Sequence, residues 1–318
     1  MPPRIVVTRC LPSATHALLR ARFDAELNLS DRRYPPDELL ARCAGKDGLL
    51  CTPGDDLSRR TIERLPASIK IIATFSVGFD HIDVPTARGR GIAVTNTPDV
   101  LTDATADLTM LLLLGACRRA TEGQALLRTG GWVGLAPTQL LGRSLAGKRL
   151  GIVGMGRIGR AVARRARPFG LAIHYHARAP VAEAGVDAVF HAQLEALLRV
   201  ADVLSLHVPL TEATRRLLDA SRIALLPDGA VVVNSARGGL VDDEALVAAL
   251  RSGRVSAAGL DVFDGEPGVH PGYLAQPNTF LLPHLGSATV EAREAMGAKA
   301  VENLSAFFAG RPLLDPVG

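Results

Sequence analysis

The chain has 318 residues, of which 47% are hydrophobic and 21% charged, and its formal net charge is +4. This composition is typical of a folded globular protein, and the length favours two domains over one. Only 4% of the residues are aromatic and no nucleic-acid-binding motif occurs, so the arginine clusters predict solvated helix faces and no nucleic-acid partner. The sequence lacks a signal-peptide pattern and an apolar run of the roughly 20 residues that span a membrane, so we expect a cytoplasmic protein without a membrane partner.

Short apolar runs alternate with helix-like segments from the amino terminus onward. Strands are predicted over Ile5–Val7, Ala25–Leu29, Gly48–Cys51 and Lys70–Thr74, and helices over Ser13–Arg22 and Pro36–Cys43. This alternation is typical of parallel strands joined by helical crossovers.

A loop that contains glycine, Phe75–Asp80, follows the strand that ends at Thr74. Ligands of open α/β sheets bind beyond the carboxyl ends of the strands, so the loop is a candidate contact for an anion. An ordinary turn from strand to helix explains its spacing equally simply, and the spacing alone favours that interpretation.

After a short strand at Gly91–Val94, a long helix is predicted from Thr102 through Cys117. Its apolar residues lie on all sides, which predicts burial between layers. We expect this helix to mark the crossing between two domains. The pattern then breaks between Gly130 and Gly147.

The centre of the chain carries a G-x-G-x-x-G motif between an apolar strand, Arg149–Val153, and a helical pattern. The free N–H groups of such a turn and the positive end of the helix dipole bind the pyrophosphate of a dinucleotide. The flanking strand and helix make the motif specific. The candidate cofactor-binding residues here are Gly154, Gly156, Arg157, Ile158 and Gly159.

Strand patterns continue beyond the motif with helices between most of them, as in a doubly wound sheet. They are Leu171–Tyr175, Val203–Leu206, Ala230–Val233, Ala257–Leu260 and Thr279–Leu282. A final helix over Thr289–Ala309 could return to the first domain, because the ends of a chain often lie close together. The predicted fold is therefore α/β, with two doubly wound parallel-sheet domains of the Rossmann type, one of them discontinuous in sequence.

The residues after the second strand indicate which dinucleotide binds. An acid about 20 residues beyond the glycines binds the ribose of NAD, whereas an arginine there accommodates the 2′-phosphate of NADP. The sequence has no acid in His174–Arg178, and Arg178 supplies a cation, so NADP is favoured over NAD. The alternative is that Arg178 is a solvated residue at a strand end.

His174 and His176 share a strand face, but a metal site needs further ligands that the sequence does not place, so we expect no metal.

Three strand ends downstream carry groups that suit hydride transfer to a carbonyl, which also requires a proton. His284 is the candidate general acid, because histidine titrates near physiological pH. Glu266 could accept a hydrogen bond from the ring, and Arg237 could hold a carboxylate and polarise the adjacent carbonyl. Each residue alone could be structural, but three complementary groups at three strand ends point to catalysis.

Seven motifs together resemble the D-isomer-specific 2-hydroxyacid dehydrogenase family, and the resemblance covers nearly the whole chain. Within that family the chain is most similar to the glyoxylate and hydroxypyruvate reductases. The motifs are Ser76-Val77-Gly78-Phe79-Asp80-His81, Thr97-Pro98-Asp99-Val100-Leu101-Thr102, Gly130-Gly131-Trp132, the glycine motif, Asn234-Ser235-Ala236-Arg237-Gly238, Gly259-Leu260-Asp261-Val262-Phe263 with Glu266-Pro267, and Pro283-His284-Leu285-Gly286-Ser287-Ala288-Thr289.

The resemblance implies that Arg237, Glu266 and His284 are catalytic and that the N–H groups of Val77 and Gly78 bind the substrate carboxylate. It implies cofactor contacts for Ser235 and for Asp261, which would orient the nicotinamide amide. It also implies a homodimer in which Trp132 reaches the partner's site.

The resemblance further implies a substrate-binding domain of residues 1–100 and 285–318, similar to flavodoxin. The dinucleotide-binding domain would then comprise residues 101–284. The substrate domain would close about hinges near Pro98–Leu101 and Pro283–Ser287 and so exclude water.

Two differences from the residues of related families make the expected activity more specific. Glu266 stands where the formate dehydrogenases of the family have glutamine, and the missing acid near Arg178 matches the NADP-dependent reductases. We expect NADPH-dependent reduction of glyoxylate and hydroxypyruvate to D-2-hydroxy acids. The alternatives are reduction of 2-ketogluconate or a bulkier 2-keto acid, and a dinucleotide-sensing protein that resembles the corepressors of this fold.

Overall fold

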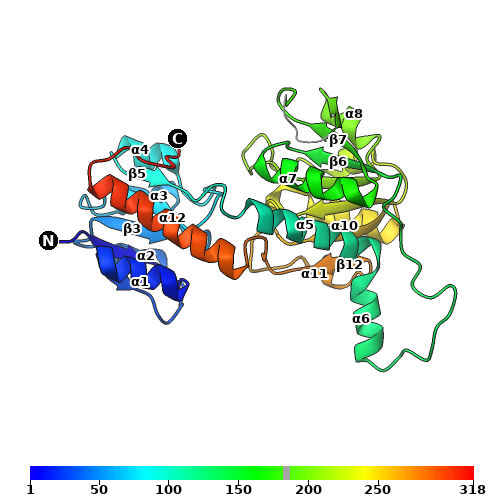
Figure 1. Ribbon diagram of the computed structural model, residues 1–318, viewed down its shortest axis with the longest axis horizontal. Helices are drawn as coiled ribbons and strands as arrows, with labels where there is room; N and C mark the ends of the chain where they lie inside the picture. The colour runs from blue at the N-terminus through cyan, green and yellow to red at the C-terminus, as the bar shows by residue number, and fades with distance from the viewer. Residues whose placement is uncertain (182–186) are drawn as a thin grey trace. The chain divides into compact units, whose positions relative to one another are not determined.

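The computed structural model describes residues 1–181 and 187–318, and the chain divides into two compact units (Figure 1). Unit 1 consists of Met1–Leu101 and Ser287–Gly318, and unit 2 of Thr102–Gly286. Each unit has its own parallel sheet with helices on both faces, so the predicted fold class is confirmed. Among the described residues, no helix combines the length and apolarity that crossing a bilayer would require.

Unit 1 contains five parallel strands in the order β2-β1-β3-β4-β5, an order that reverses between β1 and β3. Its strands are β1 (Arg4–Val7), β2 (Asp24–Leu27), β3 (Gly48–Cys51), β4 (Ile71–Thr74) and β5 (Ala93–Thr95). Its helices are α1 (Ser13–Arg22), α2 (Pro36–Arg42), α3 (Arg59–Arg64), α4 (Val84–Gly89) and α12 (Val290–Phe308). Every residue of β3 and β4 is buried, as expected of central strands covered on both faces.

Helix α12 comes from the carboxyl-terminal part of the chain and packs against α1 and β4 (Figure 1). The approach to α1 is close at Gly297, where an added Cβ would stand 1.8 Å from Thr15 Oγ1. The helix therefore supplies a layer that the first hundred residues lack, which explains why unit 1 is discontinuous in sequence.

Unit 2 contains seven parallel strands in the order β12-β11-β10-β9-β6-β7-β8. Its strands are β6 (Arg149–Val153), β7 (Ala172–His176), β8 (Ala188–His191), β9 (Val203–Leu206), β10 (Ala230–Asn234), β11 (Val255–Leu260) and β12 (Thr279–Leu281). Its α-helices are α5 (Thr102–Cys117), α6 (Ala120–Arg128), α7 (Arg157–Ala166), α8 (Leu194–Leu198), α9 (Ala220–Ile223), α10 (Asp243–Ser252) and α11 (Pro271–Leu274), and Arg167–Phe169 and Gly238–Leu240 are short 3₁₀ helices. The strand order reverses between β6 and β9, the position at which dinucleotides bind in sheets of this type.

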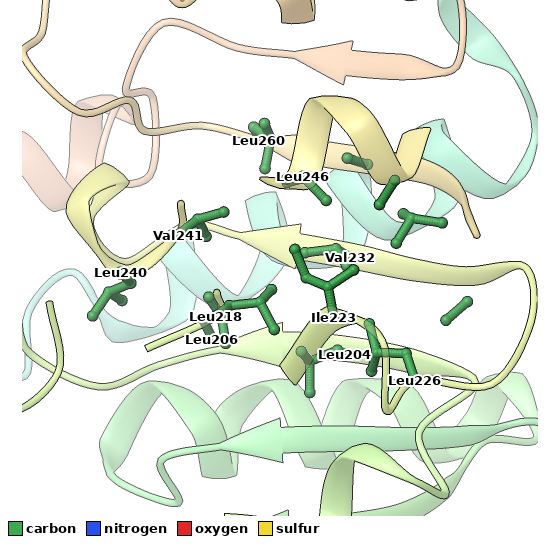
Figure 2. Packing of buried hydrophobic residues seen from close by; sticks show 14 of the residues in the cluster. Leu204, Leu206, Leu218, Ile223, Leu226, Val232, Leu240, Val241, Leu246 and Leu260 are labelled. Atoms are coloured by element: carbon green, nitrogen blue, oxygen red, sulfur yellow. The ribbon is translucent and has the colours of Figure 1, made fainter. Parts of the chain in front are cut away.

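Two apolar clusters pack on the two faces of the second sheet. Alternate residues of β10 divide between them, because successive strand side chains point to opposite faces: Val232 joins one cluster, and Val231 and Val233 join the other. Figure 2 shows part of the first cluster, in which Leu246 of α10 lies beside the sheet residues Val232 and Leu260. The rigid sheet fixes the strand ends that carry the polar groups.

Two elements of unit 2 were not predicted from the sequence. Strand β8 is a short edge strand without a fully buried residue, and α6 has no buried residue at all, so neither shows an apolar period. Helix α5 lies wholly in unit 2, packed against α7, β10 and β11, and the crossing from unit 1 precedes it at Leu101.

Candidate functional site

The turn after β6 forms a cradle at the point where the strand order reverses. His207, which follows β9, donates its backbone N–H to Val153 O at 2.7 Å, so the ends of β6 and β9 lie together. Helix α7 begins directly after Gly156, and its first-turn N–H groups belong to Arg157, Ile158 and Gly159. Such N–H groups bind anions, so this turn fits a pyrophosphate.

The three glycines of the motif serve different needs. Gly154 has φ 98°, which disfavours any side chain, and an added Cβ would stand 2.5 Å from His207 O. A Cβ at Gly159 would stand 2.1 Å from Gly154 O, so this glycine lets α7 approach the strand. Gly156 is exposed, and an added Cβ would meet no protein atom within 4 Å. The space over Gly156 is therefore free of protein, as a cradle for a ligand requires.

Arg178 lies exposed just beyond β7. Within residues 1–181 and 187–318 its guanidinium group has no hydrogen-bond or ion-pair partner, so the cation is available to a ligand. Residues 182–186 lie outside the described part of the chain.

The neighbouring histidines bond to protein groups. His174 Nδ1 is 2.9 Å from His191 Nε2, and His176 Nδ1 is 3.0 Å from His191 O. Among the described residues no group of three or more His, Cys, Asp or Glu side chains is placed to hold a metal ion.

Arg237 is positioned by the turn after β10. The buried Asn234 donates from Nδ2 to Arg237 O at 2.8 Å and accepts from Ala236 N at 3.0 Å. Gly238 allows the turn to pack on the loop after β11, since an added Cβ would stand 1.9 Å from the Phe263 carbonyl carbon. Sequence reasoning did not give Asn234 this role, although an asparagine at a strand end is a signal for such a turn.

Ser235 stands in the same turn and is half-buried. Its hydroxyl lies 2.7 Å from Thr109 Oγ1 of α5, and Thr109 also donates to Thr105 O. Thr109 was not among the predicted site residues, because a threonine inside an apolar helix carries no local signal of such a contact.

Glu266 and His284 form a bonded pair at the carboxyl edge of the sheet. His284 Nδ1 lies 2.6 Å from Glu266 Oε2, and Glu266 Oε1 accepts the Phe263 N–H at 2.8 Å. Burial alone would raise the pKa of Glu266, but the hydrogen bond and charge of His284, the Phe263 N–H and the charge of Arg237 together lower it. The pair therefore favours an ionised glutamate and leaves His284 Nε2 to face a ligand.

Asp261 is fully buried and holds the turn that carries His284. Its carboxylate accepts the Leu285 N–H at 2.7 Å and the Gly286 N–H at 2.8 Å, and its carbonyl accepts the His284 N–H at 2.8 Å. Burial raises the pKa of Asp261 to about 6, although the two N–H groups and His284 favour its charged form. These contacts give Asp261 a structural task, and its role at the nicotinamide stays a prediction.

Val77 and Gly78 lie in unit 1, in the half-buried loop after β4. Within the described residues their N–H groups donate to no protein acceptor. The arrangement suits two hydrogen bonds to an anion such as a carboxylate.

Comparison with known proteins places these features in a family. The family model described as "D-isomer specific 2-hydroxyacid dehydrogenase, NAD binding domain" matches residues 110–286. The chain is 44% identical over 310 residues to a glycerate dehydrogenase of Hyphomicrobium methylovorum, with 96% of each protein covered. The chain belongs to the D-isomer-specific 2-hydroxyacid dehydrogenase family.

Further relatives agree with this assignment. A glyoxylate reductase of Thermococcus litoralis is 42% identical over 316 residues, covering 98% of this chain and 95% of that protein. A solved structure from Polaromonas sp. JS6 66, of a protein assigned to the D-isomer specific 2-hydroxyacid dehydrogenases, has a TM-score of 0.94 and 45% identity over the full length of both chains. The NADPH-dependent glyoxylate/hydroxypyruvate reductase of Sinorhizobium meliloti, solved with NADP and malonate, has a TM-score of 0.91 and 37% identity, covering 100% of this chain and 97% of that one.

Membership of this dehydrogenase family makes the protein an oxidoreductase of small 2-keto and 2-hydroxy acids that uses a nicotinamide dinucleotide. The predicted family and enzyme class are thereby confirmed. The cradle beside β6 fits that cofactor on its own geometry, because α7 begins directly after Gly156 and an added Cβ at Gly156 would meet no described protein atom within 4 Å.

Proposed function

We propose that this dehydrogenase reduces small 2-keto acids, with glyoxylate and hydroxypyruvate as the first substrates, to D-2-hydroxy acids, and that it prefers NADPH. The bonded pair of His284 and Glu266 carries the proposal, since it supplies a held proton donor at the carboxyl edge of the dinucleotide-binding sheet. Relatives named glyoxylate reductase and glycerate dehydrogenase support this substrate class.

The proposed reduction needs one hydride and one proton. When bound, the nicotinamide cofactor supplies the hydride, whose electron pair forms the new C–H bond at C2 while the carbonyl π bond breaks. His284 donates the proton from Nε2 to the carbonyl oxygen, which becomes the hydroxyl group. Glu266 holds the ring at Nδ1, so that Nε2 is the nitrogen that gives up the proton.

Three groups are proposed to bind the keto acid. The N–H groups of Val77 and Gly78 bind the carboxylate, and the guanidinium group of Arg237 binds the carboxylate and polarises the carbonyl. In this proposal residues 1–100 and 285–318 bind the substrate, and residues 101–284 bind the dinucleotide.

A panel of 2-keto acids assayed with NADPH and with NADH tests the function. We expect the highest kcat/KM for glyoxylate or hydroxypyruvate with NADPH, and loss of turnover with retained NADPH binding in His284→Ala. A wild-type protein that turns over none of the panel would contradict the proposal.

Arg178 is proposed to bind the 2′-phosphate of NADPH, because its exposed guanidinium group has no partner in the described chain and no acid follows β7 before it. Arg178→Ala should weaken NADPH binding about tenfold, the effect of losing one charge-assisted hydrogen bond, and leave NADH binding nearly unchanged. Fluorescence titration with both cofactors measures the two dissociation constants. An equal loss of affinity for NADPH and NADH would show that Arg178 does not read the phosphate.

A homodimer is also proposed, built on the arm formed by α6 and residues 129–141. No residue of α6 is buried, and four large apolar side chains of the segment that follows are at least half exposed. They are Trp132, Val133, Leu135 and Leu141. An exposed apolar surface of this kind is typical of a protein interface.

A further inference from the structure

The loop that contains Val77 and Gly78 has three of its carbonyl groups bonded inside unit 1. Thr97 N donates to Ser76 O at 2.9 Å, and Asn96 Nδ2 donates to Val77 O at 2.8 Å. The Ser76 hydroxyl donates to Gly78 O at 2.6 Å. The carbonyl oxygens are therefore occupied, whereas the N–H groups of Val77 and Gly78 have no acceptor among the described residues.

Each of these bonds also sets the direction of an N–H group. A trans peptide is planar, so the C=O of one residue and the N–H of the next point in opposite directions. The bond from Thr97 to Ser76 O thus orients the Val77 N–H. In the same way, the bond from the Asn96 side chain to Val77 O orients the Gly78 N–H.

Asn96 is itself held in place. It follows β5, whose Thr95 pairs with Ala73 of β4, so it stands next to the loop after β4. Its N–H donates to Asp315 O at 3.2 Å. Asp315 is tied to α12, because its carboxylate accepts from the buried Asn303 at 2.9 Å and from Lys299 at 3.1 Å.

We propose that Asn96 is a positioning residue for substrate binding, whose side-chain amide aims the Gly78 N–H at the carboxylate of the 2-keto acid. The inference rests on the proposed role of Val77 and Gly78. The position needs a short donor, because an aspartate there would set an oxygen against Val77 O. Asn96 acts through the loop and does not touch the substrate.

Two variants remove the donor in different ways. Asn96→Ala shortens the side chain, and Asn96→Leu keeps the branching at Cγ and the approximate volume without a donor. In both, KM for glyoxylate with NADPH and the inhibition constant of oxamate, an unreactive carboxylate analogue, should rise about tenfold, because one hydrogen bond to a charged group is misaligned. The NADPH dissociation constant should not change, and kcat should fall less than KM rises.

Asn278→Ala is the matched control, because Asn278 also donates its side-chain amide to backbone carbonyls, those of Leu250 and Ser256. It lies before β12, at the sheet edge opposite the strand-end groups. We expect this variant to lower the melting temperature and leave KM and oxamate inhibition as in the wild type. If Asn96 had only a structural role, the two Asn96 variants would show this same pattern, a lower melting temperature with wild-type KM and oxamate inhibition.

The outcomes separate the two proposals. Wild-type KM and oxamate inhibition in both Asn96 variants would overturn the positioning role, as would a rise in Asn96→Ala that is absent in Asn96→Leu. A wild-type protein that reduces neither glyoxylate nor hydroxypyruvate would overturn the proposed function. Calorimetric titration of oxamate into the NADPH complex then measures whether any carboxylate binds.

Discussion

His284 has a backbone φ of 54°, in the left-handed region that residues other than glycine uncommonly adopt, although asparagine, aspartate and histidine do so more often than the rest. Such a conformation costs on the order of 1 kcal/mol and persists only where neighbouring contacts impose it. Asp261 imposes it here, through the three hydrogen bonds that it accepts from residues 284–286. The imidazole is thus held from two sides, by Asp261 at the backbone and by Glu266 at Nδ1.

The bond between Glu266 and His284 predicts a pH effect. The hydrogen bond and charge of His284 help to lower the pKa of Glu266, so the glutamate stays ionised and bonded to His284 Nδ1 near neutral pH. In Glu266→Gln the neutral amide has no proton to gain, so an acid limb of the reduction rate that comes from protonation of Glu266 should disappear. The pH profile of kcat/KM for glyoxylate measures this, and an acid limb that stays at the wild-type position would assign it to another group.

The lowered pKa of Glu266 also makes the stability of the fold depend on pH. Glu266 has a lowered pKa in the folded chain, so its contribution to stability is present above the ordinary value of 4.5 and is lost as the pH falls through the lowered value. His207 also lowers the stability of the fold in acid. Burial lowers its pKa from 6.5 to about 4, so the unfolded chain binds the proton at a higher pH than the folded chain does. Both groups therefore favour unfolding in acid.

At the scale of elements, β6, the glycine turn at residues 154–159 and α7 together form the proposed dinucleotide-binding cradle. Gly159 allows α7 to contact β6, whereas Gly156 faces open space. Substitutions at the two positions should therefore distinguish a packing role from a ligand-binding role. Gly159→Ala should lower the free energy of unfolding by about 1–3 kcal/mol, because its Cβ would overlap Gly154 O, and should weaken NADPH binding as well.

Gly156→Ala should keep the wild-type melting temperature, since its Cβ meets no protein atom, and should weaken NADPH binding about tenfold or more by occupying the cradle. Thermal denaturation and fluorescence titration measure the two quantities. Normal NADPH affinity in Gly156→Ala would contradict the placement of the pyrophosphate over this glycine.

At the scale of the whole molecule, the exposed arm predicts the oligomeric state. Val133 is 100% exposed and Leu135 is 92% exposed. If the arm pairs two copies, the wild type should behave as a dimer in light scattering after gel filtration. Val133→Asp combined with Leu135→Asp should convert it to a monomer, because burying two carboxylates in an apolar interface is unfavourable.

Leu274→Asp serves as the control, since Leu274 is 67% exposed in the same unit but lies outside the arm. It should leave the dimer intact. A dimer that survives the double substitution would place the interface elsewhere, and a monomeric wild type would contradict the dimer itself.

The alternation of apolar runs and the glycine motif predicted both parallel sheets, because buried strands and a phosphate-binding turn leave patterns within a few neighbouring residues. Helix α5 and strands β3, β6 and β9 begin and end where the sequence indicated. Edge strand β8 and helix α6 left no such pattern, since neither buries a continuous apolar face. The residue types at positions 237, 266 and 284 likewise predicted a catalytic set, and that role stays a prediction.

Only the tertiary structure decided how those side chains are held. The contact of Asn234 with the Arg237 turn is local, but Glu266 meets His284 across 18 positions of sequence, and Asn96 meets Val77 across 19. Such contacts arise because parallel strands bring the loops at their carboxyl ends together, and no local pattern records them. The return of the final helix to the first domain was expected from the sequence, but its contacts with α1 and β4 are likewise recorded by no local pattern.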